Sequence, residues 1–173
     1  FSCPDYCPLS YAAFLRPYCC YKGVKTQLSP TSGSMGYGTP AAISAALEHP
    51  DRPVICLAGD GCFQMTLNEL STAAQYNAKV IFIICNNGQY GTIRMHQEKT
   101  YPARVSGTAL FNPDYAALAK SYGGVGFTVT KTADFPAALD AARASNSLAV
   151  IELRLDPEAL STGATLTQTR QAA

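Results

Sequence analysis

Short apolar runs alternate along the chain with segments of helical periodicity. From Pro53 onward, four runs rich in valine and isoleucine have the length and near-continuous hydrophobicity of strands covered on both faces. These runs are residues 54–58, 79–85, 126–130 and 149–153. Because helical segments lie between them, the pattern predicts an α/β fold with a parallel sheet and helices on both faces.

The segments between the strands carry signals for helix starts. Thr39 and Pro40 place a capping side chain before a proline at the first helical position, ahead of an alanine-rich stretch that ends at residue 47. Thr66 and Glu69 have the spacing of a capping box, which predicts a helix to about residue 76. Two further helices are predicted at residues 112–122, opened by Asn-Pro-Asp, and at residues 133–144.

Both ends of the chain lack this pattern. Residues 1–25 contain dispersed prolines, cysteines and tyrosines with no sustained period, so we expect them to be irregular. Our hypothesis is that they are non-native sequence and poorly ordered. Residues 157–173 are rich in Thr, Ala and Gln and are expected to leave the globule as a C-terminal tail. The folded domain is therefore expected over residues 26–156.

Composition limits the class of partner. The 173 residues include 13 basic and 12 acidic side chains, and neither sign forms a run typical of a nucleic-acid or membrane surface. The longest apolar run, residues 80–85, is far shorter than the ~20 residues that a bilayer-spanning helix needs. We therefore expect a small molecule or another protein as the partner, and a cytoplasmic location.

The cysteines favour burial over metal binding. Zinc sites usually contain two short pairs such as C-x2-C, whereas the four cysteines near the N-terminus are spaced C-x3-C or are adjacent. They are Cys3, Cys7, Cys19 and Cys20. The other three lie in or beside apolar runs, where a small buried hydrophobe is expected. They are Cys56, Cys62 and Cys85.

Polar groups follow two of the predicted strands. Asp60 lies between two glycines directly after the first strand, and Asn86-Asn87-Gly88-Gln89 follows the second. Ligands bind at the carboxyl ends of parallel strands, and there Asp60 and Asn87 would face one another if the strands are neighbours. Carboxylate, amide and carbonyl oxygens are ligands that Mg²⁺ takes beside phosphate oxygens. Gly61 allows close backbone approach to a phosphate, and a helix starting near Thr66 would add N–H groups.

The spacing of these groups resembles a known signature. Gly-Asp-Gly alone would indicate an ordinary turn. However, residues 59–61, followed by 24 residues and then Asn86-Asn87, resemble the diphosphate-binding motif of thiamine-diphosphate-dependent enzymes. The resemblance implies that the Asp60 carboxylate, the Asn87 side chain and the Gln89 carbonyl bind Mg²⁺. It also implies cofactor contacts from the flanking residues, with diphosphate contacts from the backbone of Gly61 and Cys62. The remaining flanking residues are Gly59, Tyr90 and Gly91.

A second segment carries the same resemblance. Residues 33–38, Gly-Ser-Met-Gly-Tyr-Gly, are followed by Pro-Ala-Ala and resemble the stretch of acetolactate synthases and related decarboxylases that receives the aminopyrimidine ring. Taken alone, the segment would be a glycine-rich turn before a helix. The resemblance implies that Met35 wedges beneath the bent cofactor, that the backbone of Gly33 and Met35 bonds the pyrimidine, and that Ser34 lies in the site. It extends to about residue 155 and is closest to the C-terminal domain of the acetolactate synthase-like family.

This resemblance implies a thiamine-diphosphate- and Mg²⁺-dependent carboligase or lyase. Such an enzyme decarboxylates a 2-keto acid such as pyruvate and ligates the enamine to a second carbonyl. The cofactor-activating glutamate of these enzymes belongs to another domain, so we expect half a site here, completed in a homo-oligomer or by a partner subunit. No catalytic residue is assigned. The alternatives are a 2-keto acid decarboxylase, with its domains in one chain or divided between subunits, or a non-catalytic fragment for cofactor binding or dimerisation.

Several side chains after the metal loop are candidates for a substrate pocket. Arg94 would hold a substrate carboxylate in bidentate fashion, although an arginine on a surface loop is equally common. His96 is more often a solvated or structural histidine than a functional one. The other candidates in this segment are Tyr90, Thr92 and Gln97.

Overall fold

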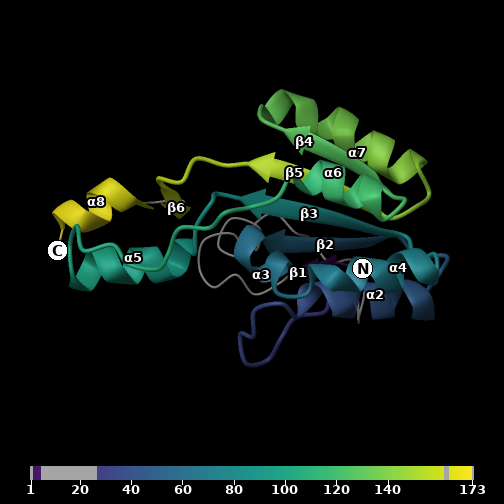
Figure 1. The fold of residues 1–173 in the computed structure, drawn as a ribbon, viewed down its shortest axis with the longest axis horizontal. Coiled ribbons are helices and arrows are strands. Elements are labelled where there is room, and N and C mark those ends of the chain that lie inside the picture. Colours follow the sequence, from purple (N-terminus) through teal and green to yellow (C-terminus); the bar gives the residue numbers. More distant parts are fainter. Residues whose placement is uncertain (1, 5–26, 162–163, 173) are drawn as a thin grey trace.

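The computed structural model describes residues 2–4, 27–161 and 164–172. Five parallel strands form the main sheet in the order β1-β2-β3-β5-β4 (Figure 1). Four of them match the predicted strands to within one residue at every end. The strands are β1 (Ser2–Pro4), β2 (Val54–Gly59), β3 (Val80–Asn86), β4 (Val125–Val129) and β5 (Ala149–Arg154).

Strand β1 lies in the segment that was predicted to be irregular. It pairs in parallel with β2, with Cys3 opposite Cys56, so the prediction is wrong for residues 2–4. The rest of that segment, including Cys7, Cys19 and Cys20, lies outside the described residues.

Helices cover both faces of the sheet, which confirms the predicted fold class. One face of β3 and β5 packs against α2 (Gly38–Glu48), α4 (Leu70–Gln75) and α6 (Tyr115–Ser121), around the rings of Phe63 and Phe82. The opposite face packs Ile83 and Ile151 against α7 (Phe135–Ala144). Because side chains alternate between the faces, burial on both sides requires the near-continuous apolar runs seen in these strands.

The helix starts differ from the predicted ones. The Thr66 hydroxyl does not cap a helix but donates to the Gly36 carbonyl at 2.9 Å, and η1 (Leu67–Glu69) then leads into α4. Thr39 lies inside α2 with a fully buried side chain that caps nothing. Asp114 caps α6 by accepting from the Ala117 N–H at 2.8 Å. A short 3-10 helix, η2 (Thr132–Asp134), precedes α7.

Two helices near the end of the sheet were not predicted. Helix α3 (Asp60–Gln64) follows β2 directly, so the helix that begins at this edge is α3 and not one near Thr66. Helix α5 (Gly91–Thr100) follows the loop after β3. Among the described residues, no helix combines the length and apolar character needed to cross a membrane.

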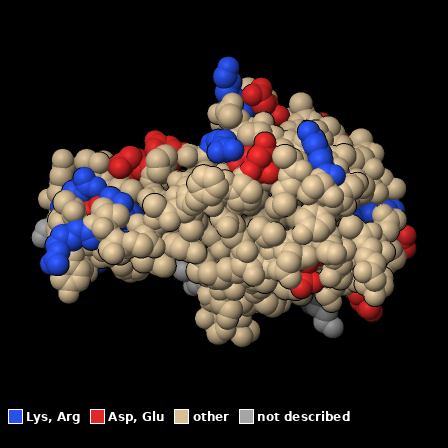
Figure 2. Space-filling model, in the orientation of Figure 1, with Lys and Arg blue, Asp and Glu red and all other residues tan. Residues whose placement is uncertain are grey.

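The C-terminal residues fold against α5. They form β6 (Ala159–Ser161), β7 (Ala164–Thr165) and α8 (Leu166–Gln171), and α8 lies beside α5 beyond the carboxyl ends of the strands (Figure 1). The predicted C-terminal tail is thus folded into these elements, and it lies with α5 beyond the end of the sheet. We call α5, β6, β7 and α8 the arm. Figure 2 shows basic side chains gathered over this end of the molecule.

Candidate functional site

The ends of β2 and β3 meet at one edge of the sheet. Gly59 lies opposite Cys85, which places Asp60 beside the loop that begins at Asn86. The Gly88 N–H donates to Asp60 Oδ2 at 2.9 Å and to Asn86 Oδ1 at 3.1 Å. The expectation that the two strand ends lie side by side is therefore confirmed.

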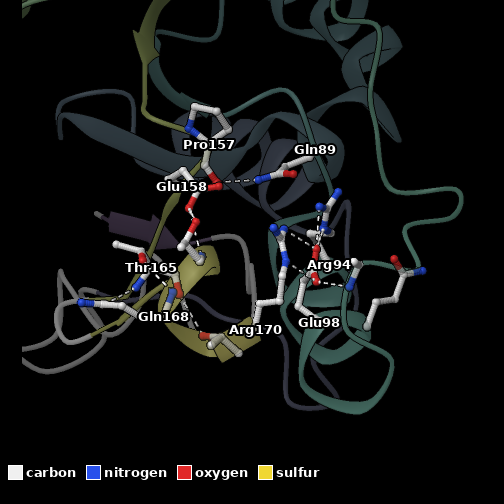
Figure 3. Close-up of polar contacts among 12 residues, drawn as sticks. Gln89, Arg94, Glu98, Pro157, Glu158, Thr165, Gln168 and Arg170 are labelled. Atoms are coloured by element: carbon white, nitrogen blue, oxygen red, sulfur yellow. Dashed lines mark hydrogen bonds and ion pairs between the residues drawn. The ribbon is translucent and has the colours of Figure 1, made fainter. Parts of the chain in front are cut away.

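The side chain of Asn87 lies within its own loop. It is buried, and its Oδ1 accepts from the Gln89 N–H at 3.2 Å. The Gln89 side chain points toward Pro157 and donates to its carbonyl at 2.7 Å (Figure 3). The side chain that joins Asp60 to this loop is instead that of Asn86, through Asn112.

Asn112 is the central amide of the site, and sequence reasoning missed it. Its Nδ2 donates to Asp60 Oδ2 at 2.7 Å and to Asn86 Oδ1 at 2.8 Å. Its Oδ1 accepts from Gln64 Nε2 at 2.5 Å and from the Tyr115 hydroxyl at 3.1 Å. The residue was expected only to open a helix. Both Asn112 and Asp114 are cap-competent, however, and since Asp114 caps α6, Asn112 is available to bridge the two strand ends.

Glu152 extends this network into the sheet. Its side chain is fully buried on β5, where it accepts from Asn86 Nδ2 at 2.5 Å and from the Thr128 hydroxyl at 3.3 Å, and pairs with Arg154 Nε at 3.0 Å. A glutamate in the middle of a strand that is apolar on both faces was the sequence signal for this role, because buried charges are almost always paired.

The groups that donate hydrogen bonds to the Asp60 carboxyl are all neutral among the described residues. Only 3% of its surface is exposed, and burial raises the pKa of the carboxyl, against the lowering effect of the hydrogen bonds from Asn112, Gly61 and Gly88. Among the described residues no lysine or arginine pairs with it. A buried carboxylate next to amide and carbonyl oxygens is a donor set that suits a hard divalent cation.

Gly61 and Tyr90 lie in contact. A Cβ at Gly61 would approach the Tyr90 ring to 2.5 Å, so the glycine is what lets the ring lie over the start of α3. The Gly61 N–H points to Asp60 Oδ1 at 3.0 Å. Cys62 is buried in the same turn, as Cys56 and Cys85 are in the strands, which confirms the expected burial of these three cysteines.

The glycine-rich loop before α2 reaches the residues that follow α3. Gly36 has φ +82° and lies against Met65 and Thr66, so the loop is tied to the α3–α4 connection. Met35 is half-buried and Ser34 is exposed, with its hydroxyl 3.0 Å from that of Ser32. The structure thus connects both segments that the resemblance identified.

Except for Tyr90, which precedes the helix, the candidate substrate residues lie on α5. Arg94 donates hydrogen bonds from Nε and Nη2 to Glu98 Oε1 at 2.9 and 2.6 Å. The Gln97 side chain bonds the backbone of Ser106, and His96 is exposed. The geometry supports the structural alternative for Arg94 and the solvated one for His96.

A comparison with known families gives a match over most of the chain. The model described as "Thiamine pyrophosphate enzyme, C-terminal TPP binding domain" matches residues 10–153. The match begins inside the segment that was hypothesised to be non-native.

Curated relatives are acetolactate synthases. The chain is 39% identical over 127 residues to the acetolactate synthase large subunit of Haemophilus influenzae, covering 72% of this chain and 22% of that protein. It is 42% identical over 112 residues to the large subunit of Pyropia yezoensis, covering 64% of this chain and 19% of that protein. The chain therefore spans about a fifth of the length of these relatives.

Solved structures share the fold. A thiamine diphosphate-dependent 4-hydroxybenzoylformate decarboxylase of Rhodococcus jostii RHA1 superposes with a TM-score of 0.82 at 32% identity, over 90% of this chain and 29% of that one. Benzoylformate decarboxylase from Polynucleobacter necessarius superposes with a TM-score of 0.84 at 26% identity, over 92% of this chain and 30% of that one.

Proposed function

We infer the function of this chain from the family to which it belongs. The chain is a C-terminal TPP-binding domain of the thiamine pyrophosphate enzymes, of the acetolactate synthase-like type. In this proposal the domain binds thiamine diphosphate through Mg²⁺. It serves an enzyme that decarboxylates a 2-keto acid such as pyruvate and ligates the product to a second carbonyl. When bound, thiamine diphosphate supplies the reactive carbon centre for this chemistry.

The observation that carries the proposal is the state of Asp60. Its carboxylate is buried at the carboxyl edge of a parallel sheet, and its hydrogen-bond partners among the described residues are neutral. An unpaired buried charge is costly, and a bound cation would offset that cost. In the proposal Asp60, the Asn87 side chain and the Gln89 carbonyl hold Mg²⁺.

The rest of the predicted site would hold the organic cofactor. The backbone at Gly61 and Cys62 would face the diphosphate, with Gly59, Tyr90 and Gly91 beside it. The loop with Gly33, Ser34 and Met35 would hold the pyrimidine.

The proposal includes a partner. In it, a pyrimidine-binding domain, from a partner subunit or within a homo-oligomer, completes the site. A cytoplasmic location is part of the same proposal.

Calorimetric titration of the full chain with thiamine diphosphate tests the binding claim. We expect binding only when Mg²⁺ is present, and no measurable binding for Asp60→Ala. Asp140→Ala is the matched control, because Asp140 is exposed on α7. Equal affinity of the wild-type chain and Asp60→Ala would contradict the ligand assignment.

A second candidate is a 2-keto acid decarboxylase, which the solved structural neighbours favour because both are named as benzoylformate-type decarboxylases. Product analysis separates the two. Acetolactate from pyruvate supports the carboligase, and release of an aldehyde from pyruvate or benzoylformate supports the decarboxylase. Cofactor binding without turnover, with or without a pyrimidine-domain partner, would support the fragment alternative.

A further inference from the structure

We propose that Asn112 and Glu152 are positioning residues that orient the Asp60 carboxylate for its cation. The proposal rests on the proposed function for the identity of the cation. It comes from a continuous chain of hydrogen bonds that runs from strand β5 to Asp60 through Asn86 and Asn112.

The orientation of Asn112 is determined from its oxygen side. Gln64 Nε2 and the Tyr115 hydroxyl both donate to Asn112 Oδ1. Because only the amide oxygen can accept, the amide nitrogen must point the opposite way, toward Asp60 and Asn86. A flipped amide would oppose donor to donor on one side and acceptor to acceptor on the other.

The orientation of Asn86 is determined from its nitrogen side. Asn86 Nδ2 donates to the Glu152 carboxylate, which is fully buried. This carboxylate also accepts a hydrogen bond from the Thr128 hydroxyl and forms an ion pair with Arg154. The amide oxygen of Asn86 therefore faces Gly88 and Asn112, whose N–H groups it accepts at 3.1 and 2.8 Å. Glu152 acts on Asp60 only through these groups.

The two oriented amides leave the oxygens of Asp60 unequal. Oδ2 accepts from the Gly88 N–H and from Asn112 Nδ2, whereas Oδ1 accepts from the adjacent Gly61 N–H. A carboxylate has about four lone-pair positions, two on each oxygen. The network thus occupies Oδ2 and presents Oδ1 with a position for a cation. Partners of this kind typically contribute 10- to 100-fold to metal affinity.

Amide hydrogen exchange of the metal-free full chain, followed by NMR at Gly88, tests the positioning directly. We expect the Gly88 N–H to exchange roughly tenfold faster in Asn112→Ala and in Glu152→Ala, the equivalent of one lost hydrogen bond. Glu152→Gln keeps an acceptor for Asn86 and should restore slow exchange. Asn68→Ala, an exposed asparagine, is the control. If Asn112→Ala does not fold, Gln64→Ala tests the same orientation from a half-buried position.

Magnesium affinity, measured by calorimetry with saturating thiamine diphosphate, gives the second readout. We expect a loss of about 10-fold or more for Asn112→Ala and Glu152→Ala, with Glu152→Gln and Asn68→Ala within about twofold of the wild-type chain. A wild-type chain that binds no Mg²⁺ would overturn the proposed function. Normal exchange at Gly88 and normal affinity in Asn112→Ala and Glu152→Ala would overturn the positioning roles.

Discussion

The buried carboxylates of Asp60, at the start of α3, and Glu98, on α5, have different surroundings. Glu98, in the arm, is 1% exposed and accepts five hydrogen bonds, four of them from Arg94 and Arg170 (Figure 3). These contacts, led by the hydrogen bonds from Arg170, lower the pKa of Glu98 to about 2. Asp60, at the sheet edge, is solvated by amides alone, and burial raises the pKa of its carboxyl.

The contrast separates a structural charge from one that is available for binding. At Glu98 two guanidinium groups satisfy the carboxylate and fasten α8 to α5, so it has no need of a further cation. At Asp60 hydrogen bonding is nearly complete, yet the charge is not neutralised by any described basic side chain. Burial by itself therefore does not identify a binding site. What separates the two carboxylates is whether the groups that donate hydrogen bonds to them are charged or neutral.

The largest difference between the two positions should appear in cofactor affinity when each carboxylate is replaced by a neutral amide. In Asp60→Asn, Mg²⁺-dependent affinity for thiamine diphosphate should fall at least about 100-fold, because Asp60 is the only charged side chain among the proposed protein ligands of the cation. Glu98→Gln should leave that affinity within about twofold. Calorimetry measures both. A large affinity loss in Glu98→Gln with little loss in Asp60→Asn would reverse the comparison.

Removing the Glu98 charge should release the arm. Glu98→Gln leaves Arg94 and Arg170 without their carboxylate, so α8 should lose most of its amide-exchange protection while β3 keeps its own. Exchange monitored by mass spectrometry on peptides from α8 and β3 provides the measurement. Glu48→Gln, at the exposed end of α2, serves as the control. Persistent protection of α8 would show that apolar contact alone holds it.

Lowering the pH should change the contributions of Glu98 and Asp60 to folding stability in opposite directions. The pKa of Glu98 falls from an ordinary 4.5 to about 2 on folding, so its stabilisation is complete above pH 4.5 and is lost as pH falls toward 2. The pKa of Asp60 rises above 3.8, so the cost of its charge is absent below pH 3.8 and grows as pH rises through the higher folded value. NMR shifts of α8 amides should follow the first transition in the wild-type chain and not in Glu98→Gln. Urea unfolding of metal-free protein should show Asp60→Asn gaining stability over wild type as pH rises, and a constant difference would contradict the assignment.

The smallest expected effect comes from a single hydroxyl. Tyr115→Phe removes the donor to Asn112 Oδ1 and to the Asp60 carbonyl, at 3.1 and 3.3 Å. Gln64 still orients Asn112, so we expect a destabilisation of about 1 kcal/mol and a change in Mg²⁺ affinity of less than about fivefold. Urea unfolding and calorimetry measure the two quantities, with exposed Tyr76→Phe as the reference. A larger loss of affinity than in Asn112→Ala would contradict the proposal that Tyr115 acts on Asp60 through Asn112.

The sheet was predictable because the signal for each inner strand lies within the residues of that strand. Each inner strand is a mostly apolar run because it is buried on both faces, so its ends are visible in the sequence. Strand β1 contains only Ser-Cys-Pro, which is too short to show a period. Helix α5 is mostly polar and lies in the arm, so it has no wide apolar stripe to detect. The glycine at position 61 suggested a turn where α3 begins.

The site was predictable only in part. Asp60 and the Asn86-Asn87 pair stand at strand ends, where the topology brings them together. Asn112 comes from a distant segment, and nothing in its neighbourhood shows which of two cap-competent residues caps α6. The Thr66–Glu69 spacing matched a capping box, but tertiary contact with the Gly36 carbonyl took the hydroxyl instead.

The loop after β3 closes on itself before the chain continues. The Tyr90 N–H donates to the Thr108 carbonyl and the Leu110 N–H to the Gly88 carbonyl, so the chain returns to the point that it left. Residues 91–107 therefore form a side excursion whose length is decoupled from the geometry of the sheet edge. Insertions or deletions there would cost little loop-closure entropy and would leave Gly88 in place. The size of this excursion can therefore change without moving the ends of β2 and β3.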